Sequence, residues 1–208
     1  MSSIIDAVKT RRSIRKYSSR RISTDVLNEI LGSARWAPSA HNAQPWRFIV
    51  LTKKALKRDL AEAMANAWKV DMNKDNMPTE VRENLTKISV ERFAHAPVIA
   101  VACLTMEDMI QYTDEFRQRF EHDLAAQSLG AAIQNVLLTA KAHGLGACWF
   151  GAPVFCKEAV RKILKIPEYV EPQALITMGY PAEKPRPLHK RPLENYSFTD
   201  YWGIKLGH

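Results

Sequence analysis

PVIAVACL, residues 97–104, is the stretch that decides the fold. After its proline, this run contains only apolar residues, three of them β-branched, which favours a strand. A strand that is apolar on both faces is typical of the middle of a sheet, and burial on both faces requires helices on both sides of that sheet. The run therefore predicts a sheet sandwiched between helices.

Further elements follow from the pattern on either side of this run. Aromatic and β-branched runs predict strands at 46–52, 146–151 and 173–180. Apolar residues at helical spacing predict helices from residue 4, from an N-cap at Ser23 or Thr24 to residue 37, and at 53–69, 123–143 and 156–164. Pro38 ends the second of these helices and begins a loop that reaches Pro45.

Three features of these elements are specific enough to check. The helix at 123–143 is rich in small residues and apolar almost all round, so we expect it to be buried and to end at a left-handed Gly144. The polar, irregular stretch 70–93 predicts a mobile or short-helical excursion over the surface. The tryptophans at 36, 46 and 149 are predicted to lie in the core.

The chain of 208 residues fits one domain spanning 1–208, without repeats. Its tail, 181–208, carries four prolines, which prevent regular structure. The tail also carries the aromatic residues Tyr196, Phe198, Tyr201 and Trp202. Aromatic side chains on an extended tail need an apolar surface, and we expect a partner subunit to provide it.

The composition of the chain indicates where in the cell the protein is expected. Three cysteines without a CxxC pair suit a reducing interior, no apolar run approaches the roughly 20 residues of a membrane span, and no signal-peptide pattern begins the chain. We therefore expect a soluble, cytoplasmic protein with no membrane partner.

The net charge of +8 raises the question of nucleic acid. No zinc-finger spacing, RNP-type motif or RGG tract accompanies the basic cluster at 11–21, so we expect no nucleic-acid partner. A compact arginine cluster better suits one small phosphorylated ligand, because arginine binds phosphate in a bidentate manner. Lys16, Arg20 and Arg21 are expected to form a solvated turn.

The absence of familiar catalytic motifs is informative. The sequence contains no GxGxxG, Walker A loop, HExxH or GxSxG motif and no dense carboxylate cluster. Hydrolytic and phosphoryl-transfer designs are therefore disfavoured, and no metal is expected. A cofactor that brings its own chemistry would explain the pattern.

Four separated segments indicate which cofactor this is: RRSIR at 11–15, PSAHNAQPW at 38–46, GLGACWFGAP at 144–153 and HKRPL at 189–193. In this order and spacing they resemble the nitroreductase family of FMN enzymes, from residue 5 to around residue 195. The resemblance implies an α+β fold with a central mixed sheet flanked by helices. It also implies an interlocked homodimer with two FMN sites at the interface, each built from both chains.

The resemblance assigns FMN contacts residue by residue. The phosphate and ribityl chain would be bound by Arg11, Arg12, Ser13, Arg15 and Arg191, with Lys190 beside them. The ring would be packed by the other subunit's loop at Pro38, Ser39 and Ala40, whereas Asn42 and Gln44 either contact the ring or close the turn. The turn of Phe150, Gly151 and Ala152 would present a backbone N–H to flavin N5. Pro153 has no N–H, so the donor would be Gly151 or Ala152. No catalytic side chain is implied, since flavin N5 carries the chemistry.

The implied reaction is a ping-pong transfer of two electrons. NADPH or NADH would reduce the flavin and leave, and a small electron-poor acceptor, such as a nitroaromatic or a quinone, would then take its place. Trp68, Phe93, Tyr112, Phe116 and Phe120, within 66–93 and 105–120, either line the acceptor pocket or simply pack. Arg47, Lys69 and Arg117 either read the 2′-phosphate of NADPH or are solvated surface charges.

Two alternatives remain open at this level. The same scaffold also supports reductive dehalogenation, flavin fragmentation and azoline oxidation, and these branches would keep the FMN contacts. A flavin-binding or nucleic-acid-associated protein without turnover would instead hold FMN that NAD(P)H fails to reduce, or bind DNA with a steep salt dependence.

Overall fold

The fold consists of one sheet and the helices that cover it, and the computed structural model describes residues 4–185 and 188–206. The elements are, in chain order, α1 (Ile4–Thr10), α2 (Thr24–Gly32), η1 (Ser33–Trp36), η2 (Ala40–Asn42), β1 (Trp46–Leu51), α3 (Lys54–Lys74), α4 (Thr79–Ala94), β2 (Val98–Thr105), α5 (Glu115–Ala142), β3 (Gly146–Phe150), η3 (Ala152–Phe155), α6 (Lys157–Leu164), β4 (Val170–Gly179) and η4 (Leu193–Asn195). The expected α+β class is confirmed.

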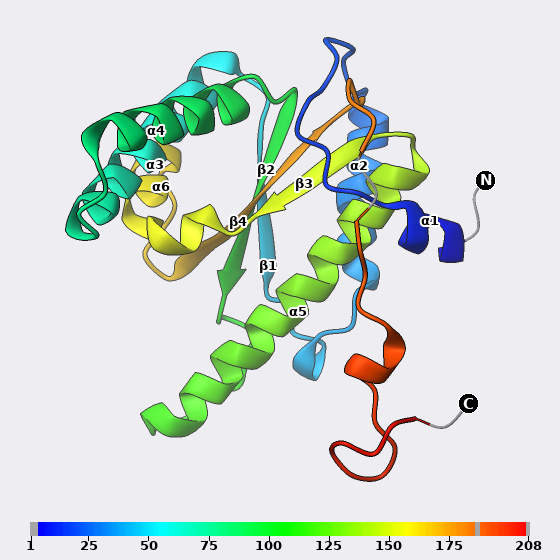
Figure 1. Cartoon of the computed structure of the whole chain (residues 1–208). Coiled ribbons are helices and arrows are strands. Elements are labelled where there is room, and N and C mark those ends of the chain that lie inside the picture. The colour runs from blue at the N-terminus through cyan, green and yellow to red at the C-terminus, as the bar shows by residue number, and fades with distance from the viewer. Residues whose placement is uncertain (1–3, 186–187, 207–208) are drawn as a thin grey trace.

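The sheet has the strand order β1-β2-β4-β3, so β2 is an inner strand, and all its residues are buried. One core, which includes Ile133 and Val136 of α5, lies on one face of the sheet. A second core, which includes Leu60 of α3 and Phe93 of α4, lies on the other face. Figure 1 shows α3, α4 and α6 grouped on one side and the long α5 crossing the other. The apolar run at 97–104 therefore predicted this layering correctly.

The pairing of the strands differs from the mixed sheet that the resemblance implied. All three strand pairs, β1–β2, β2–β4 and β3–β4, are antiparallel. The parallel pairing within the described residues is a single bridge between Ser13 and Ala147 at the edge of β3. An N-terminal segment thus extends the sheet beyond its fourth strand.

Local signals at helix ends were read correctly. Ser23 caps α2, because its side-chain oxygen accepts a hydrogen bond from Val26 N. Gly144 has a φ of +73°, the left-handed conformation expected after α5.

The prediction of a mobile or short-helical excursion at 70–93 was wrong, because most of this stretch belongs to two long helices. α3 continues to Lys74, and α4 fills 79–94. Asn76, with a φ of +55°, and Pro78, which precedes the first residue of α4, mark a short turn between two helices that pack on each other. α4 buries Thr86, Phe93 and Ala94 alone, so its apolar residues are too few for a helical period to stand out.

The long helix begins earlier than predicted. α5 starts at Glu115, where the Asp114 carboxylate accepts a hydrogen bond from Arg117 N. Its first turns are largely exposed: Phe116 is 72% exposed and Phe120 is 50% exposed, whereas Glu121 is buried. From Ala125 onward, buried residues recur at helical spacing to Ala140. Within the described residues, no helix combines the length and the apolar character that a bilayer crossing requires.

The expectation that three tryptophans lie in the core was wrong for two of them. Trp36 is 81% exposed, and Trp149 is 43% exposed although it packs over Gly130 of α5. Trp46 is half-buried against the α5-side core. The apolar face of α1 is also open, since Ile4, Ile5 and Val8 are exposed and only Ala7 is buried.

Candidate functional site

The N-terminal segment that follows α1 is fixed along the edge of β3. Ser13 bridges Ala147, and Ile14 N donates a 3.0 Å hydrogen bond to Ala147 O. The approach is close enough to require glycine at 146, because a Cβ there would lie 2.6 Å from the Cβ of Ile14. Backbone pairing therefore sets the position of the RRSIR motif, residues 11–15.

Three arginines gather around one buried thiol on β3. Burial raises the pKa of Cys148, whereas the positive charges of Arg15, Arg92 and Arg11 and a hydrogen bond with Ser13 act in the opposite direction. Arg11 and Arg15 come from the N-terminal segment and Arg92 from α4. We call Arg11, Arg15 and Arg92 the arginine cluster.

Arg92 was missed by the sequence reasoning. It lies in the stretch that was predicted to be irregular, and nothing in the local sequence links it to residues 11–15. In the structure its guanidinium carbon lies 5.8 Å from the centre of the Phe150 ring, and that of Arg15 lies 5.9 Å from the same centre. Phe93 packs edge-to-face on Phe150 with ring centres 5.0 Å apart, which fixes the Phe150 ring. We call the Phe150 ring, with Phe93 behind it, the aromatic floor.

The arginine cluster is not neutralised by the described chain. None of its three guanidiniums forms an ion pair with a carboxylate within residues 4–185 and 188–206. Glu183 binds backbone of the same segment: its Oε1 accepts from Arg15 N at 2.7 Å and from Lys16 N at 3.1 Å. These backbone hydrogen bonds, together with the positive charges of Lys16 and Arg15, lower the pKa of Glu183. Uncompensated guanidiniums attract an anion.

Arg12 differs from its neighbours. Its Nη1 donates to the carbonyls of Lys9 at 2.7 Å and Arg11 at 2.8 Å, so its guanidinium caps the end of α1. Arg12 nevertheless helps to line a cavity of about 110 Å³ beside Gly146, together with Arg11 and Lys141. The cavity lining thus carries three cations and one acid, Glu183, and its net charge favours the phosphate end of a ligand.

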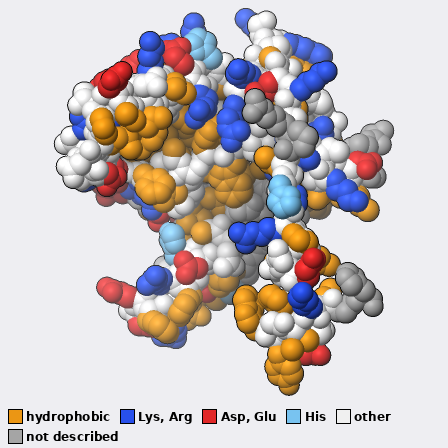
Figure 2. Space-filling model, in the orientation of Figure 1, with side chains coloured by type: hydrophobic (Ala, Val, Ile, Leu, Met, Phe, Trp, Pro, Cys, Tyr) orange, Lys and Arg blue, Asp and Glu red, His pale blue; other side chains and the backbone are white. Residues whose placement is uncertain are grey.

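The turn after β3 is open. Gly151 is exposed, and a Cβ on it would meet no atom within 4 Å, while Ala152 begins the short helix η3. Figure 2 shows a hollow between the block of α3, α4 and α6 and the side formed by α5 and the tail. Hydrophobic side chains lie on its floor, and Lys or Arg side chains lie at its edge. A planar ligand can therefore reach the backbone of this turn.

The loop at 38–44 has an unusual backbone. His41, Asn42 and Gln44 all have positive φ values, of 56°, 53° and 48°, although none is glycine. The loop is closed by a hydrogen bond from Gln44 N to Ser39 Oγ and is tied to α5 by a bond from Ala40 N to Ser128 Oγ. Such strained conformations cluster at functional sites, so this loop is a candidate part of the site.

This loop lies away from the arginine cluster within one chain. It leads into β1, whereas residues 11–15 extend β3, and these two strands form opposite edges of the sheet. Pro38, Asn42 and Gln44 are exposed. Lys190 and Arg191 are exposed too, and no hydrogen bond or ion pair within the described residues joins them to the cluster. One chain therefore brings together Arg11, Arg12, Ser13, Arg15, Phe150 and the 151–152 turn, but not the loop at 38–44 or Lys190 and Arg191.

The aromatic residues considered for the acceptor pocket differ in exposure. Phe93 is core, at 3% exposed, whereas Trp68, Phe116 and Phe120 are exposed and Tyr112 is half-buried beneath the Arg117 guanidinium. Three cations considered for a 2′-phosphate have acidic partners: Lys69 pairs with Glu83, Arg117 with Asp114, and Arg47 with Glu107 and Asp108.

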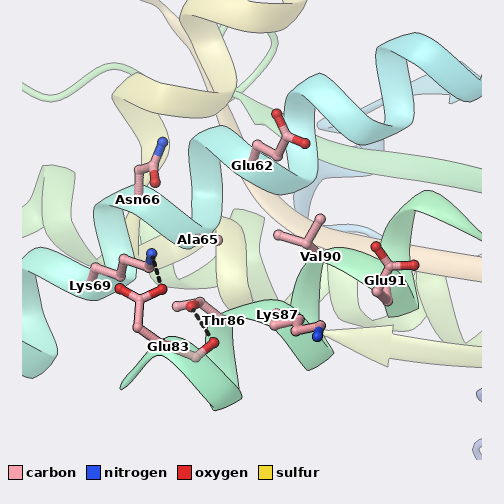
Figure 3. Close-up of a pocket in the computed structure, with 9 residues that line it drawn as sticks. All are labelled: Glu62, Ala65, Asn66, Lys69, Glu83, Thr86, Lys87, Val90 and Glu91. Carbon is pink, nitrogen blue, oxygen red and sulfur yellow. Dashed lines mark hydrogen bonds and ion pairs between the residues drawn. The ribbon is translucent and has the colours of Figure 1, made fainter. Parts of the chain in front are cut away.

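A larger cavity, of about 320 Å³, lies between α3 and α4 (Figure 3). Its lining mixes the carboxylates of Glu62, Glu83 and Glu91 with the ammonium groups of Lys69 and Lys87. None of the four motif segments contributes to this cavity, so we assign it no part in the site.

The cysteines do not supply thiolate chemistry at neutral pH. Burial raises the pKa of Cys103 to about 12 and that of Cys156 to about 11, and all three thiols are free. The arrangement as a whole defines a class: an α+β protein whose edge strand carries an uncompensated arginine cluster beside an aromatic floor and an open backbone turn.

Comparison with known proteins identifies the family within that class. Residues 8–180 match the model of the nitroreductase family, so the chain belongs to this family. It is 32% identical over 184 residues, 88% of this chain and 79% of the relative, to a Methanothermobacter thermautotrophicus protein provisionally named NADH dehydrogenase/NAD(P)H nitroreductase.

Solved structures share this fold. A nitroreductase-type structure from Desulfovibrio desulfuricans in complex with FMN is 25% identical, with a TM-score of 0.71 over 97% of this chain and 99% of that one. A BluB-like flavoprotein from Clostridium difficile is 20% identical, with a TM-score of 0.79 over 95% and 98% of the two chains.

Proposed function

We propose that this protein is an FMN-dependent oxidoreductase that passes two electrons from NADPH or NADH to nitroaromatic, quinone or similar electron-poor acceptors. The observation that carries this proposal is the arginine cluster without ion-pair partners at the edge of β3: Arg15 and Arg92 lie against the Phe150 ring, and the charge of Arg11 acts on the adjacent Cys148. Membership of the nitroreductase family and the FMN in the Desulfovibrio relative support the choice of cofactor.

The residues present fit FMN. Phosphate needs cations that are not already paired, and Arg11 and Arg15 have no acidic partner in the described chain. Ser13 adds a hydroxyl beside them, and Arg12 and Lys141 line the neighbouring cavity. The flavin ring needs flat apolar contact and an approachable backbone, which Phe150 and the open turn at Gly151 and Ala152 provide.

The chain's own residues bind and orient. When bound, FMN would supply hydride acceptance and donation at N5. Arg11, Arg15 and Arg191 would hold the phosphate, with Lys190 close to it. The N–H of Gly151 or Ala152 would donate toward N5 and stabilise negative charge on the ring, which is electrostatic preorganisation without a catalytic side chain.

A second copy of the chain completes the site in this proposal. The loop at Pro38, Ser39, Ala40, Asn42 and Gln44 would come from the partner, because it leaves the opposite sheet edge from the arginine cluster. The tail, 181–208, would pack on the partner through residues such as Trp202, 91% exposed, and Tyr201, 78% exposed. Sedimentation velocity should give twice the 23.6 kDa chain mass, and a monomer would contradict this arrangement.

The electron donor and compartment are part of the same proposal. The Methanothermobacter relative's name supports a nicotinamide donor, and the three free thiols suit the reducing cytoplasm. The acidic partners of Arg47, Lys69 and Arg117 leave no uncommitted cation among these three for a 2′-phosphate, so NADH should serve at least as well as NADPH.

Steady-state kinetics test this function. The FMN-loaded protein should oxidise NADH in the presence of 1,4-benzoquinone, and double-reciprocal plots at several quinone concentrations should be parallel, because donor and acceptor use the same surface in turn. Intersecting lines would contradict the shared surface, and no turnover with either nicotinamide would contradict the reductase function itself.

A further inference from the structure

His41 occupies a strained position in the loop before β1. Its φ is +56°, and Asn42 and Gln44 share the left-handed conformation. Histidine adopts this conformation more readily than most residues, but the conformation still costs free energy. It persists only where the surroundings fix it, and it recurs at functional sites.

Two contacts with α5 fix this loop. Ala40 N donates to Ser128 Oγ at 3.2 Å, and His41 Nε2 lies 3.3 Å from Glu121 Oε1. Glu121 and Ser128 are seven residues apart, so they lie on the same face of the helix. The helix therefore sets both the position of the loop and the direction of the imidazole.

Glu121 is a second and independent observation. Its side chain is only 6% exposed, and its Oε2 is buried without a hydrogen-bond partner in the described residues. A buried carboxylate destabilises a fold unless it is paired. Within residues 4–185 and 188–206, His41 is the one group that pairs with it.

We propose that His41 is a catalytic proton donor to the electron acceptor and that Glu121 is its positioning residue. This inference rests on the proposed function, which places the loop at 38–44 against the flavin. The His41 side chain is 41% exposed, and its Nδ1 has no hydrogen-bond partner in the described part of the chain. When the imidazole is protonated, Nε2–H points to Glu121 and Nδ1–H is left for the acceptor.

The proton balance gives His41 a defined task. Reduction of a quinone to a hydroquinone adds two electrons and two protons. FMN, once bound and reduced, would supply both electrons and one proton as a hydride, and His41 Nδ1 would donate the second proton to a quinone oxygen. His41 is then neutral, keeps Nε2–H on Glu121 and regains its proton from water. Ferricyanide takes one electron at a time without a proton, so it does not need His41.

Reoxidation kinetics separate the two kinds of acceptor. FMN-loaded His41→Asn would be photoreduced without oxygen and mixed with 1,4-benzoquinone or with ferricyanide. Reoxidation by benzoquinone should slow about 100-fold, the usual scale of a lost general acid, while reoxidation by ferricyanide stays at the rate of the unmodified protein. Asparagine is chosen because it tolerates the left-handed backbone.

Matched variants control the experiment. Glu121→Gln keeps the shape but removes the charge, and it should slow the benzoquinone step while leaving FMN affinity unchanged. His95→Gln removes an exposed histidine that pairs with Glu91 outside the site, and it should change neither rate. Equal slowing with both acceptors, or no slowing with benzoquinone in His41→Asn, would overturn the assignment.

Chemical labelling adds a readout that needs no turnover. Diethyl pyrocarbonate acylates accessible imidazole nitrogens, and mass spectrometry locates the label. Hydroquinone should slow labelling of His41 in the oxidised FMN-loaded protein but not of His95, and equal labelling of His41 with and without it would contradict contact. Failure of the unmodified protein to take up FMN would instead count against the proposed function, so the two failures are distinguishable.

Discussion

Arg15→Ala is expected to bind FMN about 10- to 150-fold more weakly than the unmodified protein. Removing a guanidinium from a charge-assisted phosphate contact costs about 1.5–3 kcal/mol. Arg15 has no carboxylate partner in the described chain, so its side chain is available to the ligand. Quenching of FMN fluorescence during titration of the FMN-free protein measures the affinity.

The neighbouring Arg12→Ala variant is the matched control. It removes the same charge from the same segment, three positions earlier, but its guanidinium already caps α1 through the carbonyls of Lys9 and Arg11. Its effect on FMN affinity should be several-fold smaller than that of Arg15→Ala. Equal losses would show that net charge alone, and not the geometry of the arginine cluster, holds the phosphate.

Gly146→Ala is expected to lower both thermal stability and FMN affinity. The added Cβ would lie 2.6–2.8 Å from Ile14 side-chain atoms, so β3 and residues 11–15 must move apart. Overpacking of this kind costs about 1–3 kcal/mol, which lowers the Tm by roughly 2–12 °C for a chain of this size. Because the same segment carries Arg11 and Arg15, the shift also disturbs the phosphate site.

Gly151→Ala provides the comparison for this variant. A Cβ at 151 meets no atom within 4 Å and the backbone φ is −81°, so the FMN-free protein should keep its Tm. Calorimetry of both FMN-free variants tests the steric argument. Equal Tm values for Gly146→Ala and Gly151→Ala would contradict it.

The layers of the fold were predictable because local chemistry decides them. The apolar run 97–104 can be stable only between two layers of helices. Ser23 begins a helix through its side-chain hydrogen bond, and Gly144 ends one through its backbone freedom. α4 could not be predicted in the same way, because it is stabilised mainly by packing on α3 and buries few apolar residues. Trp36 was expected in the core but is exposed, because the burial of a side chain depends on which other segments pack against its own.

The candidate site was predictable only in part for a related reason. The RRSIR motif and the 151–152 turn are local segments, and the structure places them side by side through the Ser13–Ala147 bridge. Arg92 and Glu121 come from helices distant in sequence, and no spacing links them to the motifs. The left-handed backbone at His41 was hidden because the usual signal, a glycine, is absent there.

The central claim is that this chain holds FMN and that a nicotinamide reduces it. An anaerobic absorbance spectrum of the FMN-loaded protein, recorded before and after addition of NADH and then of NADPH, tests this most directly. We predict that the visible flavin absorbance bleaches with NADH and returns when 1,4-benzoquinone is added. A protein that takes up no FMN, or whose bound flavin stays oxidised with both nicotinamides, would contradict the account.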